Sequence, residues 1–303
     1  MLDLIIIGAG PAGLAAAIYG KRAELDLAVI EKEAVPGGQI IITSEIDNYP
    51  GLYHTGGFEL GEKFREHAEA LGVTFTEGRV VKVETTDHVI VTLSDGKTME
   101  AKTAIIAGGA HHRYLNVPGE KELTGSGVSY CATCDGAFFR KKTAAVVGGG
   151  DVAIGDALFL ARLCAKVYVI HRREEFRAAK TLVTSLKQFE NVEFLYNSVV
   201  KEIKGDGHVE KLLLTDLKEK KDYEIDTNGI FIAVGMLPET EAYRDAVEVD
   251  ETGYIKADET CRTSNPMLFA AGDIRTKQLR QVVTAAADGA NAITSVENYL
   301  HSL

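Results

Sequence analysis

The sequence predicts an α/β fold made of two Rossmann-like nucleotide-binding domains, the second inserted in the first. An apolar strand, a glycine-rich turn, an apolar helix and a second apolar strand follow one another over residues 2–31 and again over residues 143–171. This order is typical of a βαβ nucleotide-binding unit. The separation of Gly8 from Gly148 is 140 residues and equals that of Glu31 from His171. The two units therefore align without a gap, and the chain contains an internal duplication.

Length and charge narrow the possible functions. The 303 residues provide about two domains at roughly 150 residues each. The formal net charge of −11 argues against nucleic acid or an anionic membrane as a partner, because proteins that bind phosphate polymers usually carry a basic face. We expect small molecules or other proteins as partners, no nucleic acid and no membrane.

The uncharged run over residues 4–20 is not an export signal or a membrane span in our interpretation. Asp3 rather than a basic residue precedes it, it is short for a span, and the letters GAGPAG interrupt it. We interpret it as strand, turn and helix. We therefore expect a cytoplasmic protein, and in the cytoplasm a disulfide is more often catalytic than structural.

The glycines of the first unit suit a bound dinucleotide. Gly8 and Gly10 permit a tight turn and the close approach of a pyrophosphate, and Gly13 lets the helix pack on the strand. The helix N-terminus attracts the phosphate charge. Glu31, at the end of the second strand, is expected to bind a ribose hydroxyl.

The chain then alternates between loops and strands. Residues 35–51 predict an irregular, ligand-contacting segment, and a helix is expected over residues 58–71. Residues 73–100 predict strands around a hairpin turn at 94–96, and residues 102–109 predict a buried strand that ends in glycines. His111 and His112 would point to opposite sides of a strand, so we interpret them as a solvated loop pair rather than a shared metal site.

The letters CATCDG, residues 131–136, place two thiols at the spacing of a small redox disulfide. At the start of a helix the N-terminal dipole lowers the pKa of a thiol. Asp135 is suited to exchange the proton that this chemistry moves, provided that burial raises its pKa. A zinc site is the alternative on this motif alone, but Cys164 and Cys261 stand alone and only the histidine pair offers a half-site. We predict a redox disulfide and no metal.

The second unit has basic residues where the first has an acid. His171 aligns with Glu31 and is followed by Arg172 and Arg173, with Arg177 one turn later. Arginine in this place favours NADP over NAD, because a guanidinium group pairs bidentately with the 2′-phosphate. The alternative is a solvated basic start of a helix.

The rest of the chain completes both domains. Residues 192–225 resemble the earlier meander, with a turn at 205–207. Within them, the lysine-rich residues 217–224 predict a solvated hairpin edge. Residues 229–235 then close the second unit. Residues 267–274 predict a buried strand ending at Asp273, and residues 281–300 predict an amphipathic closing helix. We expect these last segments to return to the first domain. The predicted domains are then residues 1–113 with 243–303, and an inserted domain of residues 114–242.

Several motifs together resemble those of the low-molecular-weight, bacterial-type thioredoxin reductases over essentially the whole chain. They are GAGPAG, GGQ, NYPG, CATCDG, GGGD, HRREEFRA, AAGDI and RQVVTAAADGA, in the order and approximate spacing of that family. The resemblance implies a flavoprotein with two dinucleotide-binding domains of three-layer ββα architecture. It implies FAD in the first domain, NADPH in the inserted domain that carries the CxxC motif, and a homodimer. The implied activity is thioredoxin-disulfide reduction, in which electrons pass from NADPH through FAD and the cysteine pair to thioredoxin or a related small redox protein.

The resemblance also implies roles for individual residues. Cys134 would face the flavin, Cys131 would attack the partner's disulfide, and Asp135 would be the acid–base partner. The residues expected to contact FAD are Gly8, Gly10, Pro11, Ala12, Gly13, Glu31, Gly38, Gln39, Asn48, Val80, Asp273, Arg280, Gln281 and Val282. The residues expected to contact NADPH are Gly148, Gly150, Asp151, Arg172, Arg173 and Arg177.

Two departures from the family pattern keep other hypotheses open. Val152 stands where relatives usually have Ser or Thr, and Gly155 stands where they usually have Glu. A second hypothesis is therefore a flavin thioredoxin reductase, or a related flavin disulfide reductase, that depends on ferredoxin or another donor. A third is a non-enzymatic zinc-binding or nucleotide-sensing protein with a structural CxxC motif. We also predict rotation between the domains, because the disulfide and the nicotinamide would compete for the flavin.

Overall fold

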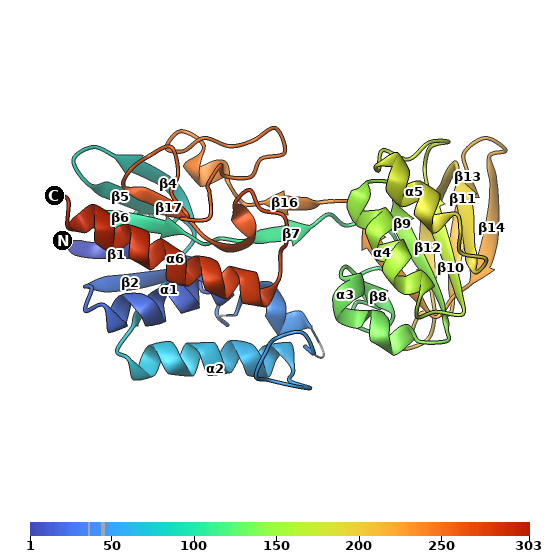
Figure 1. Cartoon of the computed structure of the whole chain (residues 1–303), viewed down its shortest axis with the longest axis horizontal. Helices are drawn as coiled ribbons and strands as arrows, with labels where there is room; N and C mark the ends of the chain where they lie inside the picture. Colours follow the sequence, from blue (N-terminus) through green and yellow to red (C-terminus); the bar gives the residue numbers. More distant parts are fainter. Residues whose placement is uncertain (36, 44–45) are drawn as a thin grey trace. The chain divides into compact units, whose positions relative to one another are not determined.

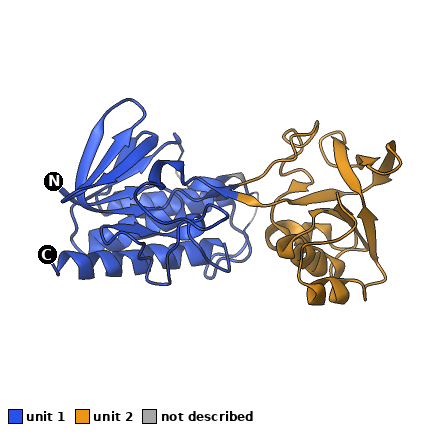
Figure 2. Cartoon of the chain, turned by 90° about the horizontal axis from the view of Figure 1, so that it is seen from above, with its two compact units in different colours: residues 1–111, 237–303 blue, residues 112–236 orange. Residues whose placement is uncertain are grey.

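A computed structural model describes residues 1–35, 37–43 and 46–303 and divides the chain into two compact units. Unit 1 consists of Met1–His111 and Leu237–Leu303, and unit 2 consists of His112–Met236 (Figure 2). The boundaries expected from the sequence were after residues 113 and 242. Pro36, Ser44 and Glu45, which belong to the segment expected to be irregular, lie outside the described residues.

Unit 1 is built on one mixed sheet with the strand order β3-β2-β1-β6-β5-β4, in which β17 also pairs with β6. Strands β1, β2, β3, β6 and β17 are parallel, whereas β4 and β5 form an antiparallel meander with β6. The strands are β1 (Leu2–Ile7), β2 (Leu27–Glu31), β3 (Thr74–Glu77), β4 (Val80–Thr85), β5 (Val89–Leu93), β6 (Thr98–Ile106) and β17 (Leu268–Ala270).

Three helices cover one face of this sheet: α1 (Pro11–Arg22), α2 (Gly57–Ala70) and α6 (Val282–Leu300). Short 3-10 helices are η1 (Gly38–Ile42), η3 (Glu241–Tyr243) and η4 (Gly272–Ile274). Helix α6 runs beside α1 (Figure 1), and a Cβ added to Gly289 would lie 2.3 Å from the Ala12 carbonyl oxygen. Small residues at this crossing therefore let the last helix pack directly on the first, and β17 and α6 return the end of the chain to unit 1.

Unit 2 has three layers. Its parallel sheet has the order β11-β10-β9-β15-β8, the meander β12-β13-β14 packs on one face, and helices pack on the other. The sheet strands are β8 (Val128–Ser129), β9 (Thr143–Gly148), β10 (Lys166–His171), β11 (Val192–Tyr196) and β15 (Gly229–Ala233), and the meander strands are β12 (Ser198–Lys204), β13 (Lys211–Asp216) and β14 (Lys221–Asp226). The helices are α3 (Ala132–Asp135), η2 (Gly136–Phe139), α4 (Asp151–Ala161) and α5 (Lys180–Leu186).

The chain passes between the units through two paired strands, β7 (Ala110–His112) and β16 (Met236–Pro238). Each strand follows a glycine with positive φ, Gly109 at 70° and Gly235 at 113°. The Arg113 N–H donates to the Gly235 carbonyl oxygen at 3.0 Å, so the two ends of unit 2 lie next to each other.

Three local expectations need correction. His111 and His112 belong to β7 and not to a loop, because β16 gives this short segment a pairing partner. The segment expected to be irregular contains η1. The strand expected to end at Asp273 ends at Ala270, and Asp273 lies in η4. Arg172, Arg173 and Arg177 lie in the loop that precedes α5, so the alternative of a basic helix start does not describe them.

Among the residues that the structure describes, no helix is both long and apolar enough to cross a membrane.

Candidate active site

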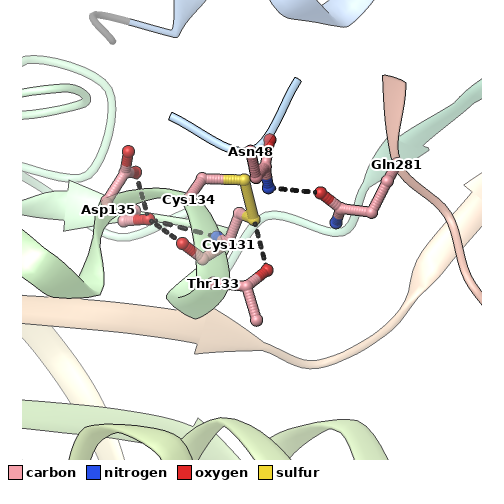
Figure 3. The surroundings of a disulfide bond; sticks show 7 residues. Asn48, Cys131, Thr133, Cys134, Asp135 and Gln281 are labelled. Atoms are coloured by element: carbon pink, nitrogen blue, oxygen red, sulfur yellow. Dashed lines mark hydrogen bonds between the residues drawn. A yellow bond between two sulfur atoms is a disulfide. The ribbon is translucent and has the colours of Figure 1, made fainter. Parts of the chain in front are cut away.

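A disulfide joins Cys131 and Cys134 at the N-terminus of α3 (Figure 3). Strand β8 leads the chain to the carboxyl end of the parallel sheet, and Cys131 caps the helix with extended backbone. The N–H groups of Cys134 and Asp135 donate to the Cys131 carbonyl oxygen at 3.3 and 3.1 Å. A thiolate formed at this helix end would gain from the helix dipole and the free N–H groups, which lower the pKa of a cysteine.

Asp135 lies beside this disulfide with its carboxyl group held by Ser129. Burial raises the pKa of Asp135, and the hydrogen bond from the Ser129 hydroxyl, 2.6 Å from Oδ2, offsets part of that rise. The same hydroxyl oxygen accepts the Cys131 N–H at 3.1 Å. Ser129 thus joins the backbone of one cysteine to an acid that can hold a proton at higher pH than an exposed carboxyl group.

In unit 1 the turn between β1 and α1 has the shape of a dinucleotide-binding turn. Gly8 has φ +105°, and a Cβ added to Gly13 would lie 1.8 Å from the Gly8 carbonyl oxygen, so neither position accepts a side chain. Gly10 is the N-cap of α1 and Pro11 its first residue, which leaves the N-terminal N–H groups of the helix available to an anion. Ala12 is the second residue of α1.

Glu31 lies at the end of β2, under this turn. Its Oε2 accepts the Ala9 N–H at 2.5 Å and its Oε1 accepts the Glu33 N–H at 2.9 Å. Gly38 approaches from the following segment, where an added Cβ would lie 3.2 Å from the Gly10 Cα. The structure therefore brings the glycine turn, the acid and Gly38 together in unit 1.

The remaining residues predicted to contact FAD lie in several elements of unit 1. The Gln39 side chain donates to the Ala110 carbonyl oxygen, and the Asn48 amide donates to Gln281 Oε1 at 2.8 Å (Figure 3). Val80 begins β4 and is half-buried. Gln281 is the N-cap of α6, and Val282 is its first residue.

At the end of the chain, which returns to unit 1, Asp273 is the residue that most clearly indicates a ligand. Its Oδ1 is buried and has no hydrogen-bond partner in the part of the chain that the structure describes. Burial raises the pKa of Asp273, although the positive charges of Lys277 and Arg280 lower it in part. Arg280 stacks on Tyr254 at 3.9 Å and donates to the Asp273 carbonyl oxygen at 3.3 Å. A buried acceptor without a partner is costly, so the site fits a ligand hydroxyl group at Asp273.

Unit 2 repeats the nucleotide-binding turn with a basic loop beside it. Gly148 ends β9, Gly150 is the N-cap of α4 and Asp151 is its first residue. The N–H groups of Arg177 and Ala178 both donate to the Gly149 carbonyl oxygen, at 2.8 and 3.1 Å. These bonds fasten the loop to the turn.

The loop between β10 and α5, which we call the basic loop, carries three guanidinium groups that are available to a ligand. The Ala179 N–H donates to Asp151 Oδ1 at 2.7 Å and adds a third tie between loop and turn. Arg172, Arg173 and Arg177 are exposed, and within the described residues none of their guanidinium groups makes a hydrogen bond or ion pair. The arginines predicted to bind NADPH are therefore held beside the turn.

Comparisons with known proteins agree over nearly the whole chain. The model of the family described as pyridine nucleotide-disulphide oxidoreductase matches residues 2–289. The chain belongs to this family. The thioredoxin reductase of Peptoclostridium acidaminophilum is 44% identical over 307 residues, covering 99% of this chain and 97% of that protein. The thioredoxin reductase of Bacillus subtilis (strain 168) is 43% identical over 302 residues, covering 99% and 95%.

The solved structures give the same result for the fold of this oxidoreductase. The structure of thioredoxin reductase from Streptococcus pyogenes matches with a TM-score of 0.94 at 46% identity, covering 100% of this chain and 99% of that chain. The resemblance found in the sequence and the predicted fold class of two Rossmann-like domains are therefore confirmed.

The sequence analysis did not single out several residues of this oxidoreductase that contact the predicted site residues. Ser129 was not singled out, although a hydroxyl residue two positions before a CxxC motif is a detectable signal. Arg275, Lys277 and Asp288, which surround the Gly272–Asp273 turn, were also missed. Buried charges at these positions have no local sequence pattern that distinguishes them from surface charges.

The described residues of the oxidoreductase contain no group of three or more His, Cys, Asp or Glu side chains arranged to hold a metal ion. Cys164 and Cys261 are buried and separate, and burial raises their pKa values to about 11 and about 12. Such thiols stay protonated and unreactive near neutral pH.

Proposed function

We propose that this oxidoreductase reduces the disulfide of thioredoxin with electrons from NADPH. The observation that carries the proposal is the Cys131–Cys134 disulfide at a helix N-terminus, in a chain that matches thioredoxin reductases over nearly their full length. Family membership confirms the predicted enzyme class, a flavin-dependent disulfide oxidoreductase that uses FAD and NADPH.

We assign FAD to the domain of residues 1–113 and 243–303. The turn from Gly8 to Gly13 would hold the pyrophosphate, Glu31 a ribose hydroxyl, and Asp273 the ribityl or pyrophosphate region. Gly38, Gln39, Asn48, Val80, Arg280, Gln281 and Val282 would complete the site. The partnerless Oδ1 of Asp273 supports this assignment, because a ligand hydroxyl group would supply the missing hydrogen bond.

We assign NADPH to the domain of residues 114–242. Gly148, Gly150 and Asp151 would lie at the pyrophosphate, and Arg172, Arg173 and Arg177 at the 2′-phosphate. The hydrogen bonds between the basic loop and the Gly149 carbonyl oxygen support this assignment, since they hold the arginines beside the nucleotide-binding turn. Arg–phosphate pairs are charge-assisted and bidentate, so we expect them to outweigh the missing hydroxyl group at Val152.

The cysteine pair carries out the exchange with the substrate. FAD, when bound, accepts a hydride from NADPH and supplies two electrons to a disulfide. The Cys131 thiolate attacks one sulfur of the thioredoxin disulfide, which forms a mixed disulfide and releases the other sulfur as a thiolate. Cys134 then attacks Cys131, reforms the Cys131–Cys134 disulfide and releases the second thioredoxin sulfur. Asp135 holds and returns the proton that these steps move.

Three further proposals follow from the family. The two domains rotate between the flavin-reducing and thioredoxin-reducing steps, the protein forms a homodimer, and it works in the cytoplasm. Two buried, protonated cysteines outside the redox pair support a reducing compartment.

The decisive experiment is anaerobic titration of the purified yellow protein with NADPH, with NADH and with reduced ferredoxin, followed by thioredoxin turnover. We expect stoichiometric NADPH to bleach the flavin absorbance and to sustain turnover, and NADH to do so poorly. Bleaching by ferredoxin alone would assign the donor differently and leave the disulfide chemistry intact. A colourless protein that keeps both thiols oxidised in the presence of NADPH would overturn the proposed function.

A further inference from the structure

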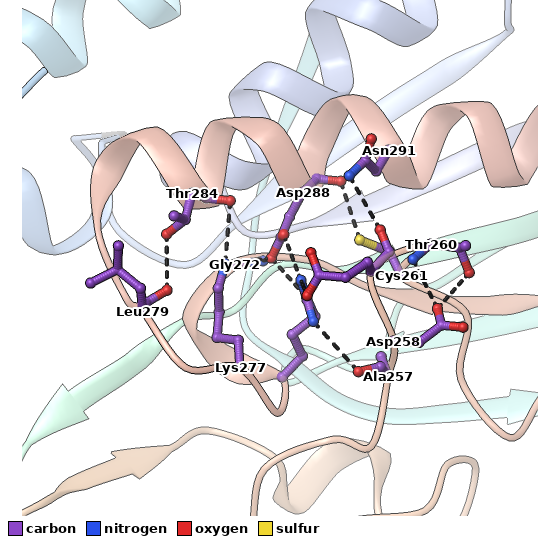
Figure 4. Close-up of polar contacts among 12 residues, drawn as sticks. Ala257, Asp258, Thr260, Cys261, Gly272, Lys277, Leu279, Thr284, Asp288 and Asn291 are labelled. Atoms are coloured by element: carbon purple, nitrogen blue, oxygen red, sulfur yellow. Dashed lines mark hydrogen bonds and ion pairs between the residues drawn. The ribbon is translucent and has the colours of Figure 1, made fainter. Parts of the chain in front are cut away.

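Unit 1 contains a buried group of charged side chains centred on Asp288, which we call the Asp288 cluster: Arg275, Lys277 and Asp288. Figure 4 labels Lys277 and Asp288. Their side chains are 1%, 4% and 5% exposed. Asp288 Oδ2 accepts the Arg275 Nε–H and a Lys277 Nζ–H, each at 2.8 Å, and Oδ1 accepts an Arg275 Nη2–H at 2.8 Å. One carboxylate on α6 thus holds two cations of the preceding segment.

The cluster contains two positive charges and one negative charge. Burial alone would raise the pKa of Asp288, but the hydrogen bonds from Arg275 and Lys277 hold that pKa below its ordinary value. Glu259 Oε1 lies 3.4 Å from Arg275 Nη2 at the exposed side of the cluster, and the charge of Lys277 also acts on the buried carboxyl group of Asp273. Removing one member of a buried ionic group leaves an uncompensated charge, which is costly, so the cluster fixes the segments that carry it.

The cluster also fixes the turn that carries Asp273. Asp288 Oδ2 accepts the Gly272 N–H at 2.8 Å. A Cβ added to Gly272 would lie 2.8 Å from the Ala12 Cβ, and one added to Gly289 would lie 2.3 Å from the Ala12 carbonyl oxygen. Gly272, which Asp288 holds, and Gly289, which follows Asp288, therefore both pack against the first turn of α1.

We propose that the Asp288 cluster is a positioning group for FAD, which fixes the Gly272–Asp273 turn and so holds Asp273 against the ligand. The inference rests on the proposed function, because it assumes that unit 1 binds FAD. Arg275, Lys277 and Asp288 do not touch the flavin in this proposal. They act through the Gly272–Asp273 turn, whose Gly272 N–H is held by Asp288.

The test uses two variants and a matched control. Lys277→Met replaces a buried cation with an unbranched apolar side chain and leaves Arg275 and Asp288 as a neutral pair. Asp288→Asn removes the shared carboxylate. Glu259→Gln removes a charge from the exposed side of the same cluster and serves as the control. For each full-length protein, FAD is removed, far-UV circular dichroism checks the fold, and flavin fluorescence gives the Kd for FAD.

We expect Asp288→Asn to weaken FAD binding by at least about tenfold and Lys277→Met by about threefold to tenfold, since each removes charge-assisted hydrogen bonds. Glu259→Gln should bind like the wild type. The increase in Tm caused by FAD should shrink in both variants, whereas a purely structural role would lower Tm equally with and without FAD. If Asp288→Asn does not fold, Lys277→Met decides.

A double-mutant cycle with Asp273→Asn tests the route of the effect. Because the cluster acts partly through Asp273, Lys277→Met should weaken FAD binding less in the Asp273→Asn background than alone. A folded Lys277→Met protein with wild-type Kd and wild-type FAD-induced Tm increase would overturn the inference, and so would equal losses in both backgrounds. Failure of the proposed function would look different, because the wild-type protein itself would then not bind FAD.

Discussion

Asp135 is the residue whose surroundings most directly predict a kinetic effect. Its half-buried carboxyl group accepts a hydrogen bond from Ser129, whose hydroxyl oxygen also accepts the Cys131 N–H. We expect Asp135→Asn to lower kcat with thioredoxin by about 10²-fold or more, the usual size of a lost general acid–base group. Stopped-flow reduction of the bound flavin by NADPH should stay unchanged. Asp206→Asn, in the turn before β13, is the control, and equal slowing of both steps would contradict the assignment.

The same carboxyl group predicts how stability depends on pH. Burial raises the pKa of Asp135, so in the window between the ordinary and the raised pKa the folded protein binds more protons than the unfolded chain. The free energy of unfolding therefore falls as pH rises through this window. Asp135→Asn removes this contribution. Urea denaturation from about pH 4 to about pH 8 should show the variant gaining stability relative to the wild type as pH rises, and a constant difference would contradict the prediction.

Residues that act with near neighbours in the chain were predictable, and those that act across the fold were not. The CxxC pair, the glycines after β1 and the acid after β2 are defined by spacing within one βαβ unit. Asn48 and Gln281 form a hydrogen bond although 233 residues separate them. Asp288 becomes a buried charge only because α6 packs on α1. Such pairs depend on tertiary packing, which a single sequence does not reveal.

Among the elements, replacement of a glycine by alanine should have opposite effects in α4 and in α1. Gly155 lies inside α4, and a Cβ there would meet open space, whereas a Cβ on Gly13 of α1 would lie 1.8 Å from the Gly8 carbonyl oxygen. Gly155→Ala should stabilise the protein by about 0.5–1 kcal/mol, because Ala loses less backbone entropy in a helix. Gly13→Ala should lose bound FAD. Thermal unfolding and flavin absorbance measure the two effects, and a destabilised Gly155→Ala protein would show that this side of α4 is covered.

The basic loop before α5 predicts the choice of nucleotide. Arg172→Ala and Arg177→Ala should each raise KM for NADPH by about tenfold or more, as expected for a lost hydrogen bond between charged groups. The KM for NADH should change little. Lys187→Ala, an exposed cation at the end of α5, is the control. Equal increases for both nucleotides would mean that the arginines do not bind the 2′-phosphate.

His111 and His112 show why the sequence did not predict strand β7. A loop was expected because adjacent histidines in a strand would point to opposite sides and share no metal. The segment forms β7 because β16, more than a hundred residues later in the chain, pairs with it. A three-residue strand has no periodicity to detect. The duplicated βαβ units, by contrast, are long and strongly patterned and were predicted with their order intact.

For the whole molecule, the glycines before strands β7 and β16 predict where the proposed domain rotation is controlled. Gly109 and Gly235 have positive φ, and a Cβ on Gly109 would meet no atom within 4 Å. Alanine at either position costs about 1–2 kcal/mol in the left-handed conformation alone. If rotation changes these angles, Gly109→Ala and Gly235→Ala should change kcat with thioredoxin on the order of tenfold. An unchanged kcat in both variants would place the hinge elsewhere.

Unit 1 is formed by two separate stretches of the chain, and this sets the order in which the two units can fold during synthesis. Unit 2 is one continuous stretch, His112–Met236, so it can fold as soon as that stretch has left the ribosome, because domains generally fold as units during translation. Unit 1 has to wait for its last residues, since α1 stays uncovered until α6 (Val282–Leu300) is made. The domain whose synthesis begins first should therefore be the last to fold and to acquire its flavin.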